Sequence, residues 1–451
     1  MDCYIGIDLG STTTKTVVLD EEENVIGRGI TNSRSNYTLA RDISREEAEI
    51  NSRFMLFRRK IEENGRASQI IGDLMDWLSC KFHLAQHLKQ VKALETVCTR
   101  EAEAGADRDQ CRKVRQCLPG IFQQMAAGAL PLFQPGVKSK SDFFRDIASS
   151  QFLEIAEHFT GNGACSFDRL TGIYDHAILG VESMNFSEAY REYFEFACRE
   201  TVNQDQFKEF EEDIRGATEY ALGCQLKVIN TIGTGYGRAT LPFPKHQIRS
   251  EILCHGLGAH AMFPNTRTVL DIGGQDTKAI QVDGRGLVTH FQMNDRCAAG
   301  CGRYLGYIAD EMNVGVHELG PLASQSTKKV RINSTCTVFA GAELRERLAL
   351  GEKRSDILNG LHRAIILRAM SLLARSGGVA NEFTFTGGVA KNEAANRALK
   401  ELIFENYGEM VLNISPDSIY TGALGAALFA RRDQDGDLAN VDLDKLRKQK
   451  S

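Results

Sequence analysis

The chain has 451 residues, of which 42% are hydrophobic and 25% are charged, and its formal net charge is −5. This length predicts two to three domains with ample core. Basic residues are scattered rather than clustered, which argues against a nucleic-acid partner. No apolar run approaches the roughly 20 residues that span a bilayer, and the chain starts with a strand pattern rather than a signal peptide. We therefore expect a cytoplasmic protein without a membrane partner.

One pattern occurs twice, 263 residues apart: residues 7–15 read IDLGSTTTK and residues 270–278 read LDIGGQDTK. Each copy runs from an apolar strand through an acidic residue and a glycine turn into a second strand, at 16–19 and 279–282. Glycines let backbone N–H groups approach phosphate oxygens, hydroxyls and lysines add donors, and carboxylates hold Mg²⁺ through water. A single copy could be an ordinary hairpin turn. Two copies favour two related domains that hold one nucleotide in a cleft between them.

Between the first hairpin and the next strand pattern, at 228–238 (VINTIGTGYGR), the sequence changes character. Segments 45–64, 67–89 and 207–224 carry apolar residues at helical spacing, which predicts a largely helical insertion. A loop with prolines and a glycine near 130–140 divides this insertion.

From Thr266 onward the predicted order is strand, hairpin, helix, strand and helix. It closes at residues 383–392 (FTFTGGVAKN), where Gly387 and Gly388 break a strand and open a helix. Such a turn lets a flat ring or a phosphate approach the backbone, and we interpret it as the adenosine side of the cleft. The predicted organisation is a first subdomain over 1–30 and 228–265, an insertion over 31–227, a second subdomain over 266–430, and a charged, solvated tail over 431–451.

The chain has twelve cysteines, spread along its length. For most of them we expect small buried residues rather than disulfides; these include Cys80, Cys98, Cys198, Cys224 and Cys254.

Two cysteines stand at predicted helix starts. Cys297, in 294–305 (NDRCAAGCGRYL), stands at the start of a helix that runs through 304–312, and Cys336, in 333–339 (NSTCTVF), lies where a strand passes into a helix over 342–350. A helix N-terminus stabilises a thiolate and an anionic iron–sulfur cluster. Without a C-x₂-C pair or a nearby histidine group, zinc within one chain is not expected. The two cysteines are either half of a tetrathiolate that a partner chain completes, or buried structural residues.

Taken together, these motifs resemble the ATPase family that activates 2-hydroxyacyl-CoA dehydratases and ATP-dependent benzoyl-CoA reductases, within the actin, sugar-kinase and Hsp70-like superfamily. The resemblance covers 1–30 and about 228–430. It implies an α/β fold with a duplicated ATPase core and, in this chain, a large helical insertion. Six motifs carry it in order: DLGST at 8–12, TGYGR at 234–238, DIGGQD at 271–276, NDRCAAG at 294–300, STCTVF at 334–339 and TGGVA at 386–390.

The resemblance implies Mg-ATP on the glycine-rich hairpins. It also implies one four-iron four-sulfur (4Fe-4S) cluster, half held by Cys297 and Cys336 and half by a homologous ATP-binding subunit. The expected nucleotide-site roles are Mg²⁺ and water positioning for Asp8 and Asp271; phosphate binding for Gly10, Ser11, Thr12, Thr13, Lys15, Gly273 and Gly274; orientation of the attacking water for Gln275 or Asp276; and adenosine binding for Gly387 and Gly388.

The implied activity is that of an ATP-driven electron pump, which takes electrons from ferredoxin and passes them to catalytic, acyl-CoA-binding iron–sulfur subunits. The long insertion resembles the larger ATP-binding subunit of benzoyl-CoA reductase, because compact dehydratase activators lack it. The expected function is therefore that of the electron-activating subunit in the reduction of an aromatic acyl-CoA to a cyclic diene. The alternatives are a homodimeric activator of a 2-hydroxyacyl-CoA dehydratase and a small-molecule kinase of the same superfamily.

One position departs from the family pattern, since relatives usually carry Thr where this chain has Cys301. Within a helix, Cys301 would share a face with Cys297 at i+4. It is either a spare ligand, a packing substitute for Thr or a neighbour of the ligands, and we favour the last two interpretations.

Overall fold

The computed structural model describes residues 1–33, 36–65, 68–103, 108–137, 144–160, 165–184, 186–235, 242–295, 300–332 and 337–433. The chain forms two compact units, which we call the sheet unit (Met1–Glu49 and Leu226–Ser451) and the helical unit (Ile50–Gln225). The division falls within helix α1 (Tyr37–Asn64). The helical unit thus lies inside the insertion predicted over 31–227.

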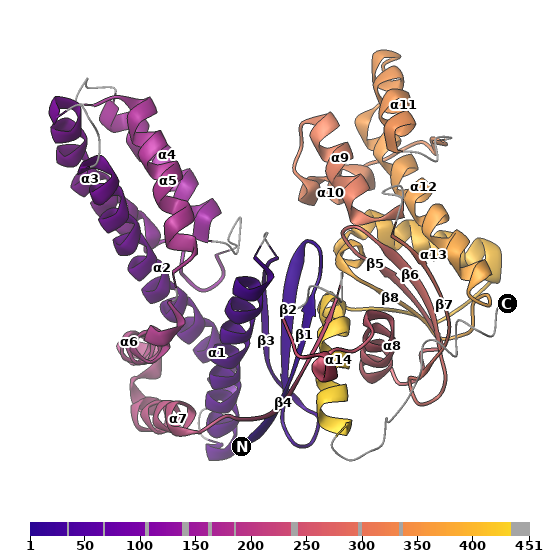
Figure 1. The fold of residues 1–451 in the computed structure, drawn as a ribbon, viewed down its shortest axis with the longest axis horizontal. Helices are drawn as coiled ribbons and strands as arrows, with labels where there is room; N and C mark the ends of the chain where they lie inside the picture. Colours follow the sequence, from indigo (N-terminus) through magenta and orange to yellow (C-terminus); the bar gives the residue numbers. More distant parts are fainter. Residues whose placement is uncertain are drawn as a thin grey trace. The chain divides into compact units, whose positions relative to one another are not determined.

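The sheet unit contains two sheets with the same topology (Figure 1). In each sheet three strands form an antiparallel meander, and a later strand joins the first strand of the meander in parallel. The first sheet has the order β3-β2-β1-β4, with β1 (Asp2–Leu9), β2 (Thr13–Leu19), β3 (Val25–Asn32) and β4 (Lys227–Gly235). The second has the order β7-β6-β5-β8-β9, with β5 (Thr268–Ile272), β6 (Thr277–Val282), β7 (Val288–Asn294), β8 (Phe383–Thr386) and β9 (Leu412–Ile414).

The two predicted hairpins are confirmed, and their registers are identical. Asp8 stands opposite Lys15 in the first hairpin, and Asp271 stands opposite Lys278 in the second. The constant offset in the sequence is therefore a structural equivalence.

The repeat extends to the strand that joins each hairpin in parallel. Gly235 ends β4 with φ +125°, and Gly387 follows β8 with φ +88°. A Cβ on Gly235 would lie 2.2 Å from the carbonyl oxygen of Leu9, and a Cβ on Gly387 would lie 2.4 Å from that of Ile272. Both positions require glycine, because the backbone conformation and the close approach each exclude a side chain.

The helices of the sheet unit beyond α1 are α8 (Glu251–Met262), α9 (Gly302–Met312), α10 (Leu319–Ser324), α11 (Thr337–Ala349), α12 (Arg354–Arg375), α13 (Glu393–Tyr407) and α14 (Thr421–Arg432). Figure 1 shows α8 and α14 between the two sheets. Their backbones touch, since a Cβ on Gly258 would lie 2.0 Å from the Thr421 carbonyl oxygen and one on Gly425 would lie 1.8 Å from that of Cys254. Residues of both sheets and both helices share one apolar core, which sets the position of α8.

A second apolar core joins the second sheet to α9, α10, α12 and α13. Helix α12 is the one helix in the described ranges that is long and apolar enough to cross a bilayer. Its most apolar window is 61% buried inside the protein, as in the core helix of a soluble protein, and this is weak evidence for a membrane span.

The helical unit is built from the second half of α1 and from α2 (Ile71–Glu103), α3 (Arg108–Ala129), α4 (Phe144–Thr160), α5 (Phe167–Glu182), α6 (Tyr190–Val202) and α7 (Glu211–Gly223). Its core is rich in aromatic rings, such as Phe54 with ring centroids 5.2 Å from Phe82 and 4.9 Å from Phe194. The helices predicted from apolar periodicity fall largely within α1, α2 and α7, and turns follow α3 near residue 130 as expected.

Within the described residues, ten cysteines are present and none of them is in a disulfide. Of the cysteines expected to be buried, Cys98, Cys198 and Cys254 are buried, whereas Cys80 and Cys224 are half-buried.

Candidate functional site

A cavity of about 270 Å³ lies between the two hairpins. It brings together most of the residues predicted for nucleotide binding. Its lining includes Asp8, Gly10, Ser11, Thr12, Thr13, Lys15, Asp271, Gly273, Gly274, Asp276, Gly387 and Gly388. Gln275 is half-buried and does not line this cavity.

The two hairpin tips touch each other at the cavity. A Cβ on Gly274 would lie 2.3 Å from Oγ1 of Thr12, so a side chain at residue 274 would require the Thr12 side chain to move. Backbone N–H groups of both tips are thus available to one anionic ligand, as expected for glycine-rich phosphate loops.

Asp271, in the second hairpin, is buried and fully engaged by protein groups. Its Oδ1 accepts a hydrogen bond from Thr386 Oγ1 at 2.8 Å, and its Oδ2 accepts one from Lys278 Nζ at 3.3 Å. Burial raises the pKa of Asp271, but attraction to His255 and Lys278 and the Thr386 hydrogen bond outweigh it and lower the pKa to about 2. The carboxylate is therefore ionised at neutral pH and held in one orientation.

Asp8, the equivalent residue of the first hairpin, is only 3% exposed, but one of its oxygens is free. Oδ2 lies 3.9 Å from Lys15 Nζ. Within the described ranges, Oδ1 has no hydrogen-bond partner. Buried carboxylate oxygens are rarely left without a partner, because the desolvation penalty is high. An orphaned acceptor on the cavity wall marks a place for a donor or a cation.

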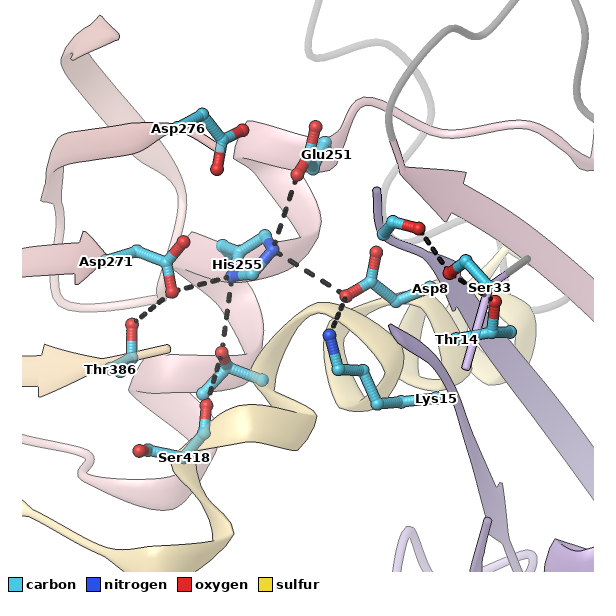
Figure 2. Close-up of polar contacts among 12 residues, drawn as sticks. Asp8, Thr14, Lys15, Ser33, Glu251, His255, Asp271, Asp276, Thr386 and Ser418 are labelled. Carbon is cyan, nitrogen blue, oxygen red and sulfur yellow. Dashed lines mark hydrogen bonds and ion pairs between the residues drawn. The ribbon is translucent and has the colours of Figure 1, made fainter. Parts of the chain in front are cut away.

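Helix α8 adds two residues that the sequence analysis did not assign to the site, Glu251 and His255. In Figure 2 the His255 ring lies between the two aspartates. Its Nε2 is 4.0 Å from Asp8 Oδ2 and 3.8 Å from Glu251 Oε1, and its Nδ1 is 3.5 Å from Asp271 Oδ1. The available signal was the E-x-x-x-H spacing, which places both side chains on one face of the helix. That signal alone does not say that this face meets the cavity.

The residues around Asp8 fit a divalent cation. One ligand atom each from Asp8, Glu251 and His255 lie within 4.8 Å of one another, and carboxylate and imidazole groups are established cation ligands. Asp271 offers less, because both of its oxygens already bind protein donors. Of the two aspartates predicted to hold Mg²⁺, the geometry favours Asp8.

Charges on the cavity wall support the same conclusion. Four carboxylates, Asp8, Glu251, Asp271 and Asp276, line it with three lysines, which leaves a formal surplus of one negative charge when His255 is neutral. A polyphosphate would be repelled by this surplus unless a cation accompanied it.

The lysine of the second hairpin is buried among carboxylates. Lys278 Nζ lies 2.8 Å from Asp276, 3.0 Å from Glu251 and 3.3 Å from Asp271. Burial lowers the pKa of Lys278, but the three carboxylates raise it well above its usual range. Burial likewise raises the pKa of Glu251, but Lys278 and His255 reverse this, so that the pKa of Glu251 is lowered. The pKa of Asp276 is raised, chiefly by burial.

The predicted cluster ligands Cys297 and Cys336 lie outside the described residues, as do Tyr236, Gly237 and Arg238 of the TGYGR motif. Two helices begin close after the two cysteines in the chain, α9 at Gly302 and α11 at Thr337.

Cys301 corrects one expectation. It is completely buried and is the N-cap residue of α9, so it precedes the helix rather than lying inside it. The shared helix face with Cys297 is therefore wrong, because the helix begins only at Gly302. Complete burial favours the interpretation of Cys301 as a packing residue.

A model of the BadF/BadG/BcrA/BcrD ATPase family matches residues 5–430 of the chain. The chain belongs to this family. The match covers both hairpins of the ATPase and runs through its helical unit, and it confirms the predicted family.

Individual relatives align with about half of this ATPase or less. The (R)-2-hydroxyglutaryl-CoA dehydratase activating ATPase of Acidaminococcus fermentans is 44% identical over 200 residues, which are 44% of this chain and 74% of that protein. The activator of lactoyl-CoA dehydratase of Anaerotignum propionicum is 42% identical over 200 residues, again 44% of this chain and 74% of that protein. One of the benzoyl-CoA reductase subunits of Thauera aromatica is 33% identical over 226 residues, 50% of this chain and 79% of that protein.

The fold of the ATPase also matches a solved structure. The crystal structure of the Acidaminococcus fermentans (R)-2-hydroxyglutaryl-CoA dehydratase component A superimposes with a TM-score of 0.54 at 24% identity, covering 96% of this chain and all of that one. Together with the duplicated sheets, this confirms the predicted α/β fold of the actin, sugar-kinase and Hsp70-like class.

Proposed function

We propose that this ATPase activates a 2-hydroxyacyl-CoA dehydratase by ATP-driven electron transfer. The observation that carries the proposal is a cation-ready cavity between duplicated hairpins, in a chain 44% identical over 200 residues to a dehydratase-activating ATPase. Our first expectation, the benzoyl-CoA reductase subunit, rested on the long insertion. Both kinds of relative leave about half of this chain unaligned, so the insertion does not separate them, whereas the identities favour the dehydratase activators.

Nucleotide binding is assigned to the two tips. In the proposal, backbone N–H groups of residues 10–13 and of Gly274 bind phosphate oxygens, and Lys15 adds a charged donor. The Gly273 N–H already donates to the Asp276 carbonyl oxygen at 3.0 Å, so Gly273 contributes by leaving room for phosphate, as Gly387 and Gly388 leave room for adenosine. Asp8 would hold Mg²⁺ through its free Oδ1, with Glu251 and His255 beside it. Mg²⁺, when bound, neutralises phosphate charge and polarises the bond that hydrolysis breaks.

For the attacking water, the candidates are now distinguished by their environments. Asp271, with a pKa of about 2, is a poor proton acceptor but a rigid hydrogen-bond acceptor, which suits orientation of the water. Asp276 lines the cavity and keeps the orienting role predicted for it, whereas Gln275 lies outside the lining.

For electron transfer, we propose that Cys297 and Cys336 hold half of a four-iron four-sulfur cluster and a second copy of this chain the other half. The cluster, when bound, supplies one-electron transfer at low potential. The described helices α9 and α11 begin after these cysteines in the chain. The first two N–H groups of α9, those of Gly302 and Arg303, donate to the carbonyl oxygens of Gly273 and Gly274, which links this helix to the tip of the second hairpin. A cytoplasmic location, ferredoxin as donor and an acyl-CoA-binding iron–sulfur acceptor belong to the same proposal.

The test is anaerobic purification, followed by assays of iron, sulfide and ATP hydrolysis, and then of electron transfer to a 2-hydroxyacyl-CoA dehydratase component with a low-potential reductant. We expect about one four-iron cluster per two chains and dehydratase activity that depends on ATP. Cys297→Ala should lose the iron but keep nucleotide affinity. Activation of benzoyl-CoA reductase catalytic subunits instead would restore our first expectation. Iron-free protein that phosphorylates an added alcohol or acid would indicate a kinase.

A further inference from the structure

We propose that Lys278 is a positioning residue of the hydrolysis site. In this assignment it does not bind phosphate but holds the carboxylates of Glu251 and Asp276 in place on the cavity wall. The inference rests on the proposed ATP hydrolysis and concerns a residue whose equivalent in the first hairpin, Lys15, is assigned to phosphate.

All three N–H donors of the Lys278 ammonium are engaged by carboxylates. A lysine ammonium has three N–H donors. Nζ of Lys278 has three carboxylate partners, Asp276 at 2.8 Å, Glu251 at 3.0 Å and Asp271 at 3.3 Å, and its side chain is 2% exposed. No donor is left for a phosphate oxygen.

Lys15, the equivalent lysine of the first hairpin, is held much more loosely than Lys278. Its Nζ has one ion-pair partner within the described ranges, Asp8 Oδ2 at 3.9 Å, and its side chain is 16% exposed. This distance is beyond a hydrogen bond. The same motif position therefore presents free donors in the first hairpin and saturated donors in the second.

The three carboxylate partners of Lys278 belong to helix α8 and to the second hairpin. Glu251 begins α8, whereas Asp276 lies at the tip of the second hairpin and Asp271 lies next to the last residue of β5, so one ammonium ties α8 to the second hairpin. Glu251 and Asp276 line the cavity beside the expected phosphate positions. Without Lys278 their mutual repulsion would be uncompensated in a buried place, so that they would move apart or take up protons.

The consequence is a separation of binding from hydrolysis. Phosphate binding is assigned to backbone groups of both tips and to Lys15, none of which Lys278 contacts within the described ranges. Loss of Lys278 should therefore lower kcat, while loss of Lys15 should weaken binding.

The experiment compares Lys278→Met with Lys15→Met in the full-length protein, purified anaerobically and assayed with Mg-ATP. Binding is measured separately with a fluorescent ATP analogue. For Lys278→Met we expect kcat to fall roughly 100-fold or more, with the dissociation constant changed less than about threefold. For Lys15→Met we expect the dissociation constant to rise about tenfold or more.

Two further variants distinguish a positioning role of Lys278 from a general loss of structure. Lys278→Arg keeps the charge and the donors and should recover at least about tenfold of the lost kcat. Adding Glu251→Gln to Lys278→Met removes one of the uncompensated charges and should lower kcat by less than the product of the two single effects. If Lys278→Met does not fold, Lys278→Arg carries the test: its kcat should stay within about tenfold of that of the unmodified protein with unchanged nucleotide affinity, and a weakened affinity at unchanged kcat would overturn the inference.

An unchanged kcat in Lys278→Met, or a weakened nucleotide affinity at unchanged kcat, would overturn the inference and leave the proposed function intact. Absence of ATP hydrolysis in the unmodified protein would refute the proposed function itself. The two failures are thus distinguishable.

Discussion

The two hairpins share one motif and one register, but their charged side chains differ in how many protein groups they bind. In the first, Asp8 Oδ1 has no hydrogen-bond partner among the described residues, and Lys15 has one loose ion pair there. In the second, Asp271 and Lys278 bind each other and further protein groups. The difference shows that a duplicated motif need not carry a duplicated role. The charged groups of the first hairpin can bind a ligand, whereas those of the second are held in place by protein groups.

A single threonine in each parallel strand illustrates how the copies diverged. Thr386 Oγ1 donates to Asp271 at 2.8 Å, whereas the equivalent Thr234 Oγ1 donates to the Arg249 carbonyl oxygen at 3.0 Å. The threonine of the first copy is thus turned away from its aspartate. Among the described residues, Oδ1 of Asp8 therefore accepts no hydrogen bond.

The largest expected effect tests whether the first hairpin is the open one. Asp8→Asn should reduce ATP hydrolysis roughly 10²- to 10³-fold, because it removes the charge that faces the expected cation. It should leave thermal stability nearly unchanged, since Oδ1 has no protein partner in the described residues. Steady-state ATPase assays and thermal unfolding measure the two effects. Normal activity with a large loss of stability would reverse the roles of the two hairpins.

The next effect concerns the glycine that follows the same pattern in both copies, Gly235 in the first and Gly387 in the second. Gly235→Ala and Gly387→Ala should each destabilise the protein by about 3 kcal/mol, because a Cβ meets a carbonyl oxygen in a backbone conformation that disfavours side chains. Gly408→Ala is the matched control. Its backbone lies in the same region as that of Gly387 (φ +79°, ψ −157°), but a Cβ there meets open space, so only the conformational strain of about 1–2 kcal/mol should remain. Urea unfolding measures all three variants, and equal costs would mean that the close contacts relax.

A smaller effect concerns the pH dependence of stability that the Asp271 carboxylate causes. Because the pKa of folded Asp271 is about 2 and that of an unfolded Asp is about 3.9, its ionisation stabilises the fold above pH 4, and this stability is lost as the pH falls through 2. The stability difference between the unmodified protein and Asp271→Asn should shrink by about 2 kcal/mol over that range. Unfolding midpoints at pH 5 and below measure it. A difference independent of pH would contradict the low pKa.

The smallest effect concerns the two threonines. Thr234→Val and Thr386→Val should each cost about 1 kcal/mol of stability, since each loses one hydrogen bond. Only Thr386→Val should also raise the pKa of Asp271 toward its unfolded value and so reduce the loss of stability in acid, because only Thr386 donates to that carboxylate. Acid unfolding of the two variants compares them directly. The same acid sensitivity in Thr234→Val would show that the threonines act alike.

Sequence reasoning was most successful where interactions are local. Asp8 pairs with Lys15, and Asp271 with Lys278, only seven residues along the chain, so hairpin, register and phosphate-type tip follow from a short motif. The apolar periodicity of α1, α2 and α7 was equally direct, because helix faces repeat within a few residues. The helix around Cys301 was misjudged by a few residues, since its start depends on packing.

What the sequence by itself determined is the duplicated hairpin pair, the helical insertion and the family. Only the tertiary structure decided that Glu251 and His255 face the cavity, that Lys278 is saturated and that Asp8 Oδ1 has no partner among the described residues. The physical reason is distance along the chain. Helix α8 is placed by backbone contact with α14, more than 150 residues later, through Gly258 and Gly425. No local pattern in α8 encodes the site that this contact creates.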